Sequence, residues 1–275
     1  MQGKRRRPFR IALYLLAALH LLLFSCRERV SIHLDFSKAS TWRYLLGVDI
    51  NGSLYADDSL REFSSSLRTY LQGNISAHDQ NSIYFLTDQP RISSDFLNDI
   101  EKKNLELELE HVKLLISPKE GALYTPDNHT LPAINIGEWD LLRNFTKVLP
   151  VLPENKVSPG ERWEREREFP LETKYGDAIG HLYQVFKFDS LFSLDSSTEF
   201  AALSWIYSYK IEMRSYDSIA QSLNIPLSGN GEGTAVIDLK QHKIRKAHVR
   251  FDSEPTGGNQ SEIKWNETIH LEIVE

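Results

Sequence analysis

The chain has 275 residues, of which 41% are hydrophobic and 25% are charged, and its formal net charge is −6. A net acidic surface is repelled by nucleic acid and by anionic lipid head groups, so the composition argues against a nucleic-acid partner and against electrostatic membrane binding. A single cysteine excludes an internal disulfide, so the stability of the fold must come from its core.

Residues 1–25 have the pattern of a secretory signal peptide. Five Lys and Arg side chains and no acidic ones lie among the first ten residues, and an apolar run from Ile11 to Phe24 is broken only by His20. This run would form about 21 Å of helix, which is shorter than the ~30 Å hydrocarbon core of a bilayer. A basic start followed by a short apolar run therefore predicts export rather than a membrane-spanning helix.

The end of this run, Leu23-Phe24-Ser25-Cys26, resembles the lipobox of bacterial lipoproteins, and Cys26 is the only cysteine in the chain. The resemblance implies cleavage before Cys26 and attachment of a diacylglycerol to its thiol, which would anchor the protein to a membrane of the bacterial cell envelope. Arg27 follows in place of the aspartate of an inner-membrane retention signal, which favours the outer membrane, facing the periplasm. The alternatives are an ordinary secretory peptide and an uncleaved anchor.

After the leader, residues 26–40 are expected to form a lipid-anchored tether, and residues 41–275 a single β-rich domain. Trp42, Tyr44 and Leu46 alternate with smaller or polar residues, which indicates a strand. Asn51-Gly52 is a strong signal for a two-residue hairpin turn.

The next part of the chain predicts strands around Phe63–Ser76 and Ser82–Asp88, the latter closed by Pro90, and a short helix over Ser94–Lys103. Leucine and glutamate alternate from Leu105 to Glu110, which predicts a half-buried strand with a carboxylate face. Carboxylates along one strand face lie ~7 Å apart, which suits solvent better than a shared metal ion.

A proline-rich crossing segment covers residues 118–160 and contains one predicted amphipathic helix, Glu138–Leu149. Its apolar residues share one face, which we expect to pack against the concave side of the sheet. They are Leu141, Leu142, Phe145, Val148 and Leu149.

Strands return after this segment, rich in aromatic and β-branched residues. They are Trp163–Phe169, His181–Ser193, Glu199–Met213, Thr234–Leu239, Ile244–Asp252 and Ile263–Val274. Together these elements predict a mainly β fold: a long-stranded, curved antiparallel sheet, an open or half β-barrel, with one central amphipathic helix.

No catalytic or metal-binding motif is found. The glycines of Gly229–Gly233 precede a strand rather than a helix, so they predict the start of a strand rather than a phosphate-binding loop. Asp49-Ile50-Asn51-Gly52 lacks the later residues of a calcium loop, and the scattered histidines give no zinc pattern. No Gly-x-Ser-x-Gly motif occurs, and we predict no cofactor and no enzyme activity. A Ser-His-Asp triad assembled only in space would leave no such motif in the sequence.

The run from Glu161 to Glu168 places Trp163, Arg165 and Arg167 on one strand face and glutamates on the other. The arginines could receive an anionic head group. Ion pairing across a solvated edge strand is the preferred interpretation.

The aromatic strand residues are the candidate ligand-binding residues: Trp42, Tyr44, Trp205, Tyr207 and Tyr209. With the lipobox and the long-stranded sheet, the chain resembles the half-barrel lipoproteins and carriers of the LolA/LolB type. It also resembles uncharacterised envelope lipoproteins in two stretches, Val157–Trp163 and Gly231–Asp238. The resemblance implies a non-enzymatic envelope lipoprotein that holds an apolar ligand such as lipid. The alternative is a structural or adaptor lipoprotein with a filled core that docks other envelope proteins.

Overall fold

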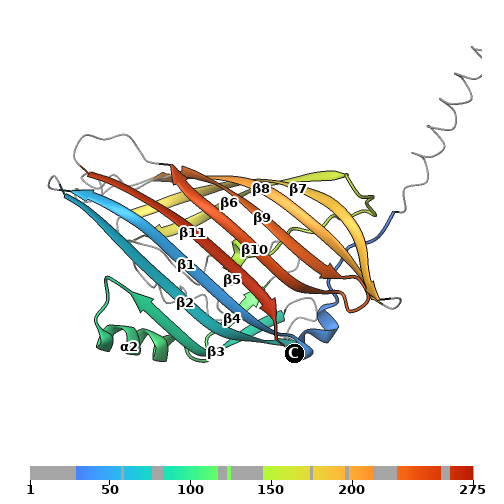
Figure 1. Cartoon of the computed structure of the whole chain (residues 1–275), viewed down its shortest axis with the longest axis horizontal. Helices are drawn as coiled ribbons and strands as arrows, with labels where there is room; N and C mark the ends of the chain where they lie inside the picture. Colours follow the sequence, from blue (N-terminus) through green and yellow to red (C-terminus); the bar gives the residue numbers. More distant parts are fainter. Residues whose placement is uncertain are drawn as a thin grey trace, which may run out of the picture.

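The computed structural model describes residues 29–56, 59–75, 83–116, 123–124, 145–173, 176–195, 198–213, 228–254 and 261–274. They form one eleven-stranded antiparallel sheet in the order β5-β4-β3-β2-β1-β11-β10-β9-β8-β7-β6 (Figure 1). The first and the last strand, β1 and β11, are neighbours in the middle of this order and pair over residues 44–56 of β1. Strands β5 and β6 are the edges of the described sheet.

The strands are long. Their bounds are β1 Arg43–Ala56, β2 Ser59–Ile75, β3 Ile83–Ser94, β4 Lys113–Ile116, β5 Leu123–Tyr124, β6 Arg162–Thr173, β7 Gly176–Asp195, β8 Thr198–Met213, β9 Ser228–Asp238, β10 Lys243–Glu254 and β11 Ser261–Ile273. A 3₁₀-helix, η1 (Phe36–Thr41), and two α-helices, α2 (Asp99–Leu109) and α3 (Phe145–Val148), complete the described elements.

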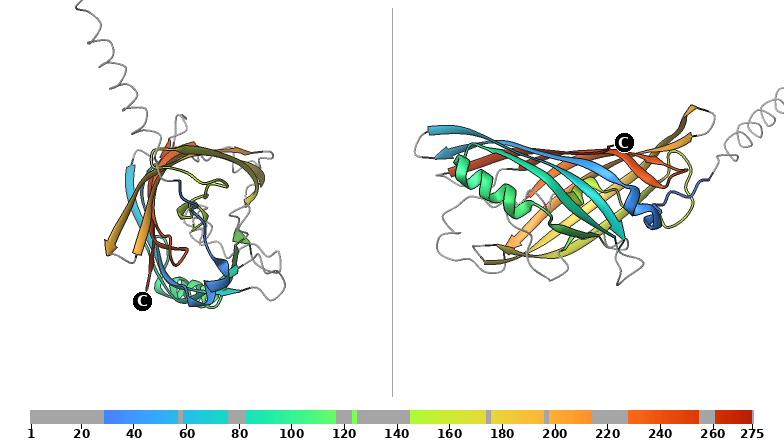
Figure 2. Two further views of the ribbon diagram at one scale, coloured as in Figure 1. Left: turned by 90° about the vertical axis from the view of Figure 1, so that its right-hand side faces the viewer. Right: turned by 90° about the horizontal axis from the view of Figure 1, so that it is seen from below.

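The sheet curves around an interior that contains residues 145–160 and the chain before β1 (Figure 2, left). Side chains alternate between the two faces of each strand, and the buried ones point into this concave side. In β1, for example, Leu46, Val48 and Ile50 are fully buried. The predicted mainly β fold with a curved, open antiparallel sheet is confirmed.

The predicted hairpin turn at Asn51-Gly52 is wrong, because both residues lie inside β1. Asn51 pairs with Asn266 of β11 and with Ser64 of β2. A Cβ at Gly52 would overlap the ring of Phe63. The glycine therefore makes room for an aromatic ring and does not form a turn.

The predicted strand over Leu105–Glu110 is also wrong, because Leu105–Leu109 belongs to α2. Asn98 caps this helix, and its side chain accepts hydrogen bonds from the backbone of Ile100 and Glu101. The side chain of Glu101 accepts a bond from the backbone N–H of Asn98 in return, which completes a capping box.

The glutamates of this segment explain why a helix is preferred at this place in the sheet. Glu106 and Glu110 are one helical turn apart, and their carboxylates accept hydrogen bonds from the backbone N–H groups of Ile92 and Gln89 in β3. Strand β4 pairs with residues 83–86 of β3 and does not reach the rest of that strand. Helix α2 therefore provides hydrogen-bond acceptors for backbone N–H groups of β3 beyond β4.

Pro90 does not close β3, as the sequence predicted, but lies within it. Gln89 has a positive φ of 52°, and the pairing register with β2 shifts between Arg68 and Tyr70. Such a bulge is one of the few places where a strand tolerates proline.

Much of the expected tether, residues 26–40, packs against the domain from Val30 onwards. Val30 forms a two-way backbone bridge with Val157, and Ile32 is 1% exposed. Asp35 caps η1, and its backbone N–H donates to the carbonyl of His242 in the β9–β10 turn.

The predicted helix Glu138–Leu149 is described only at its end, as α3. Leu141 and Leu142 lie outside the described residues, while Val148 is fully buried and Leu149 is half-buried against the core. Helix α3 contacts β10 and β11 on the concave side, as expected. No helix within the described residues has the length and apolar character needed to cross a membrane.

Candidate functional site

An aromatic layer crosses the concave face from β6 to β8. Trp163, Phe186 and Trp205 occupy one register position on the three strands. The ring centroids of Trp163 and Phe186 are 5.7 Å apart, and those of Phe186 and Trp205 are 5.6 Å apart. On the remaining strands from β9 to β3, the residues paired at this register position are a glycine and then aliphatic residues. We call this set the apolar row: Trp163, Phe186, Trp205, Gly233, Val249, Ile269, Val48, Leu67 and Ile92.

Glycines in β9 allow the aromatic layer to continue beyond β8. Tyr207 of β8 and Phe251 of β10 both pair with Gly231. Their rings stack across it at 6.0 Å and 11°, and a Cβ at Gly231 would overlap the ring of Tyr207. Gly233 leaves room for Trp205 in the same way. The glycines lead into a strand rather than a helix, as predicted, but β9 includes Gly229–Gly233 and so begins earlier than the predicted strand Thr234–Leu239. The glycines serve ring packing.

The next register position, toward the β1–β2 turn, differs because it carries buried polar groups. Gln184 is 2% exposed, Tyr207 is 4% exposed and Glu267 is fully buried. We call this set the polar row: Arg165, Gln184, Tyr207, Gly231, Phe251, Glu267, Ile50, Ser65 and Ser94. The concave face is therefore apolar at one level and polar at the next.

One cation from the interior segment reaches the polar row. Lys147 of α3 donates to Oε2 of Glu267 at 2.7 Å, and the Lys147 side chain is 20% exposed. Its Nζ also lies 5.1 Å from the centroid of the Phe251 ring. This ion pair holds α3 over β10 and β11.

Several buried polar atoms of this site have no hydrogen-bond partner among the described residues. They are Trp205 Nε1, the hydroxyls of Tyr207 and Tyr209, Gln184 Oε1 and Glu267 Oε1. Burial, and secondarily the charge of Glu267, raises the pKa of both tyrosines far above their usual range, so both hydroxyls stay protonated and can donate. Buried polar groups are normally paired with protein, water or an ion, and this property makes the cluster the candidate site.

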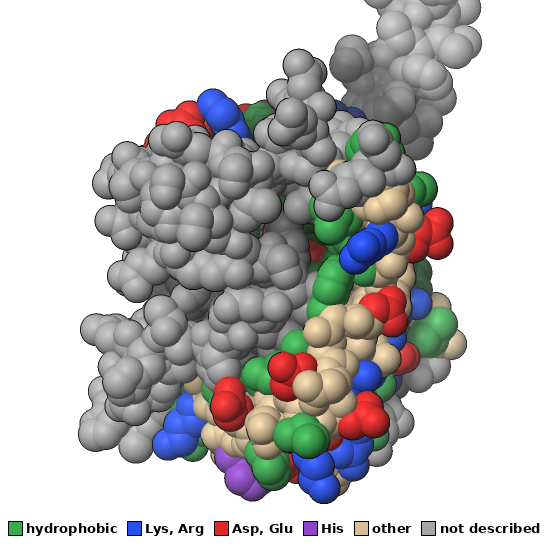
Figure 3. Space-filling view, turned by 90° about the vertical axis from the view of Figure 1, so that its left-hand side faces the viewer, with side chains coloured by type: hydrophobic (Ala, Val, Ile, Leu, Met, Phe, Trp, Pro, Cys, Tyr) green, Lys and Arg blue, Asp and Glu red, His purple; other side chains and the backbone are tan. Residues whose placement is uncertain are grey.

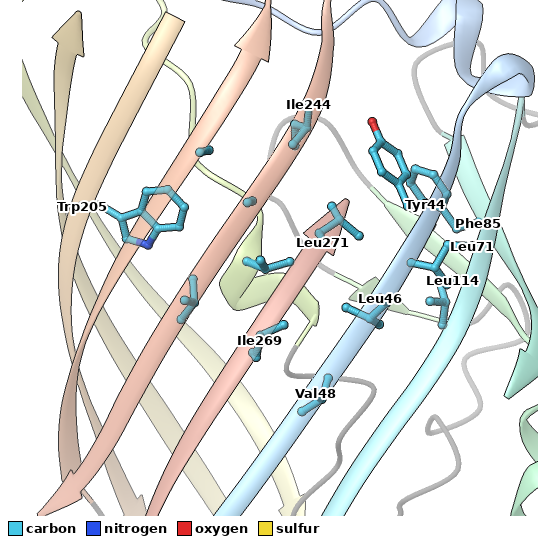
Figure 4. Close-up of a cluster of buried hydrophobic side chains, with 14 of the residues drawn as sticks. Tyr44, Leu46, Val48, Leu71, Phe85, Leu114, Trp205, Ile244, Ile269 and Leu271 are labelled. Carbon is cyan, nitrogen blue, oxygen red and sulfur yellow. The ribbon is translucent and has the colours of Figure 1, made fainter. Parts of the chain in front are cut away.

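The structure groups the predicted ligand-binding residues into two separate clusters. Trp205, Tyr207 and Tyr209 lie together on β8, and Tyr209 packs edge-on against Phe251 at 5.2 Å. Trp42 and Tyr44 form the other cluster, with Phe85 beside Tyr44. Both Trp42 and Tyr44 are 2% exposed, and burial raises the pKa of Tyr44. Aliphatic side chains, including Ile269, Leu271 and Ile244, lie between Trp205 and Tyr44 (Figure 4).

Sequence reasoning missed Glu267, Gln184 and Lys147. A signal for Glu267 was present, because it interrupts an otherwise apolar alternation along β11, formed by Ile263, Trp265, Ile269, Leu271 and Ile273. Lys147 had no such signal, since its partner is 120 residues away in sequence.

The charged run of β6 has the predicted facing. Arg165 and Arg167 are half-buried on the concave side, while Glu164, Glu166 and Glu168 are exposed on the outer side. Glu168 lies 3.2 Å from His181 of β7, so cross-strand pairing occurs on that outer face.

Trp163, on the concave side of the same strand, donates its Nε1–H to the carbonyl of Val151 at 2.8 Å.

A depression of about 210 Å³ lies over β6–β9 and is lined mostly by residues of the outer face. It is bordered by exposed and polar side chains that include Glu166, Tyr183, Ser208 and Asn230, and of the predicted site residues Tyr209 alone borders it. Among the described residues there is no cluster of three or more metal-ligand side chains. Cys26 lies outside the described residues.

No family model and no curated protein matches the sequence. Among solved structures, one concerned with lipid–protein interactions in lipovitellin is similar with a TM-score of 0.45 and 12% identity, over 85% of this chain and 25% of that chain. The chain thus spans about a quarter of that protein's length.

Two bacterial structures are also similar. A LolA superfamily protein from Nitrosomonas europaea has a TM-score of 0.18 and 8% identity, over 87% of this chain and 92% of that one. A DUF1329 family protein from Desulfovibrio piger has a TM-score of 0.15 and 8% identity, over 84% and 86%. These values assign the chain to no family, and its function is inferred from its own residues.

Proposed function

We propose that this chain is a non-enzymatic lipoprotein of the bacterial envelope that holds an apolar ligand, such as lipid, on the concave face of its half-barrel. The observation that carries the proposal is the aromatic layer over β6–β10, built by Trp163, Phe186, Trp205, Tyr207 and Phe251 across the glycines of β9. Covering such a surface is favourable by about 25 cal/mol per Å² of apolar area removed from water.

The way in which this surface is covered supports an exchangeable ligand. Over β10 and β11 the described cover is α3, four residues long and joined to the sheet by the Lys147–Glu267 pair. A helix of that length spans about 6 Å, while neighbouring strands are ~4.8 Å apart. Among the described helices, α3 is the one that a ligand would displace to reach Phe251, whose ring centroid lies 5.1 Å from Lys147 Nζ.

The proposed anchor would hold the domain close to its membrane. Cys26 precedes Val30 by four residues, and Val30 already pairs with Val157. Four extended residues span at most about 14 Å. A lipid on Cys26 would therefore place the domain against the membrane surface from which a ligand could be taken.

Two measurements test the proposal. The chain, purified from a bacterial envelope, should carry co-purified lipid in native mass spectrometry. After delipidation, an apolar fluorescent probe should bind saturably, perturb tryptophan emission and be displaced by fatty acid or phospholipid. Absence of both co-purified lipid and saturable binding would overturn the proposal.

The adaptor function is the second candidate, supported by the burial of the rings and by the rim of the domain. Trp205 and Tyr207 are 2% and 4% exposed, as in a filled core. The rim beside the β1–β2 turn shows hydrophobic side chains among charged ones (Figure 3), and Tyr55 and Leu60, which flank that turn, are 43% and 64% exposed. A failed lipid test together with specific capture of one envelope protein through this rim would favour the adaptor function.

A further inference from the structure

The hairpin between β7 and β8 ends in apolar side chains on the outer side of the sheet. Phe192 is 36% exposed and Leu194 is 78% exposed. Phe200 pairs with Phe192, and the two rings stack with their centroids 5.4 Å apart. Phe200 is 6% exposed, yet it lies outside the hydrophobic core, since Ala201, next to it on β8, is the residue that faces the core. We call Phe192, Leu194 and Phe200 the apolar tip.

The apolar tip lies where the hairpin extends past its neighbouring strands. Strand β6 begins at Arg162, which pairs with Lys187, so β7 continues past the start of β6 over residues 188–195. On the other side of the hairpin, the pairing of β8 with β9 begins at Phe200. Residues 193–199 therefore project beyond the paired part of both neighbouring strands.

The described chain begins beside this hairpin. Nη2 of Arg29 lies 3.3 Å from Oε1 of Glu161, and the backbone carbonyl of Glu161 accepts a hydrogen bond from the N–H of Phe188 at 3.0 Å. Cys26 precedes Arg29 by three residues, which span at most about 11 Å when extended. Phe192 follows Phe188 by four residues on β7, which is about 13 Å along the strand. A lipid on Cys26 and the apolar tip can therefore reach the same membrane surface.

Both features lie at one end of the half-barrel. Figure 1 shows the N-terminal segment, in blue, at the right-hand end together with the ends of β7 and β8 that carry the tip, whereas α2 and the β1–β2 turn lie at the left. Glu199 is exposed beside the tip, and the chain has a formal net charge of −6, so charge does not draw this end to anionic lipid. A bilayer contact here would be made by the apolar side chains together with the acyl chains on Cys26.

We propose that the apolar tip inserts into the interface of the membrane that holds the lipid on Cys26, so that the β7–β8 end of the half-barrel faces the bilayer. This inference rests on the proposed function and deepens it, because it sets the end at which a lipid would enter the concave face. A few apolar side chains bind a membrane weakly by themselves. Next to an acyl anchor they act as a second point of attachment and fix the orientation of the domain.

Quenching of a fluorescent label by membrane lipids tests this orientation. The acylated full chain carrying Leu194→Cys takes an environment-sensitive label at residue 194, because acylation blocks Cys26, the only native cysteine. The protein is reconstituted on vesicles of phosphatidylethanolamine and phosphatidylglycerol that include lipids with a nitroxide on the acyl chain. The label at residue 194 should be quenched about twofold or more strongly than the same label in Leu60→Cys. Leu60 is the control, because it is 64% exposed at the opposite, β1–β2 end.

A second pair of variants changes the tip without changing the labelled residue. In a chain labelled through Ser193→Cys, Leu194→Asp places a charge at the tip, where insertion would remove it from water, so the quenching should fall to the level found at residue 60. Leu107→Asp is the matched control, because Leu107 is 66% exposed on α2 at the other end, and it should leave the quenching at residue 193 unchanged.

The outcomes separate this inference from the proposed function. If the chain floats with the vesicles but the label at residue 194 is quenched no more than the label at residue 60, or if Leu194→Asp has no effect, the orientation is wrong and the lipid-holding function stands. If the chain without any substitution stays in solution when the vesicles are floated, the anchor and the orientation are both wrong. Strong quenching at residue 194, in a domain that binds no apolar probe, would support the orientation and overturn the lipid-holding function.

Discussion

Lys147 and Glu267 form an ion pair at 2.7 Å between α3 and β11, and the Glu267 side chain is fully buried. The first prediction follows from this pair, because a buried charge that loses its partner is strongly destabilising. Lys147→Met should lower the free energy of unfolding by about 3–5 kcal/mol in urea denaturation, whereas Lys147→Met with Glu267→Leu should recover most of the loss.

Lys210 and Glu212 provide the control for this pair. Their side chains are 2.8 Å apart but 65% and 53% exposed, so Lys210→Met should cost less than about 1 kcal/mol. If Lys147→Met and Lys210→Met lowered the free energy of unfolding by similar amounts, the burial of Glu267 would not explain the stability contributed by its ion pair.

The second prediction concerns the glycines of β9. A Cβ at Gly233 would overlap the indole ring of Trp205, so Gly233→Ala must displace that ring, at a cost of about 1–3 kcal/mol. Near-ultraviolet circular dichroism should change with it. Glu232→Ala, on the exposed side of the same strand, should change stability by about 0.5 kcal/mol or less and leave the spectrum intact.

The third prediction separates helix from strand in the Leu-Glu run. In α2, Leu109 is 1% exposed and Leu107 is 66% exposed, although an alternating strand would bury both equally. Leu109→Ala should cost about 2–5 kcal/mol and Leu107→Ala under about 0.5 kcal/mol. Equal losses in chemical denaturation would restore the strand interpretation.

The fourth prediction is a pH dependence at the junction of the N-terminal segment with the β9–β10 turn. His33 and His242 stack with centroids 4.1 Å apart, and burial, followed by His33 and Lys38, lowers the pKa of His242. The unfolded chain therefore takes up the proton first as the pH falls through 6.5, so stability is present above that value and decreases below it.

NMR titration of the His242 ring should give a pKa below 6.5, and His33→Gln should move it back upward. The acid Asp35 would not mask the effect, because its hydrogen bonds with Ser37 and Lys38 lower its pKa to about 2, so it stays ionised throughout this range. A ring pKa at or above 6.5 would contradict the prediction.

The last prediction concerns Cys26. Replacement by Ser removes the thiol that the lipobox resemblance requires, so palmitate labelling and lipoprotein-type processing should both be lost. Unchanged labelling and unchanged membrane fractionation in Cys26→Ser would exclude the anchor.

The sequence by itself determined the mainly β class and the positions of most strands, because side-chain alternation in a strand depends on local backbone geometry alone. It also indicated Trp205, Tyr207 and Tyr209 as one face of β8, since residues two apart always share a face. The sequence led to a wrong prediction where a strand pattern and a helix pattern fit the same residues. The Leu105–Glu110 run fits a strand by period two, but Leu105 and Leu109 also fit one helical face, and the capping box at Asn98 together with the unpaired edge of β3 favours the helix.

Tertiary structure alone decided which strands are neighbours and therefore which side chains share a register row. The pairing of β1 with β11 and of β8 with β9 brings Ile50, Glu267, Tyr207 and Gln184 to one level of the concave face, although they are spread over more than two hundred residues of chain. Asn51-Gly52 shows the same dependence, because a local turn signal is overruled when β2 and β11 pair with the strand on both sides and Phe63 fills the space above the glycine. Local patterns determine which residues face inward. Long-range hydrogen bonding determines which side chains they meet there, because the register between strands that are far apart in sequence follows from their pairing in the sheet and not from local backbone geometry.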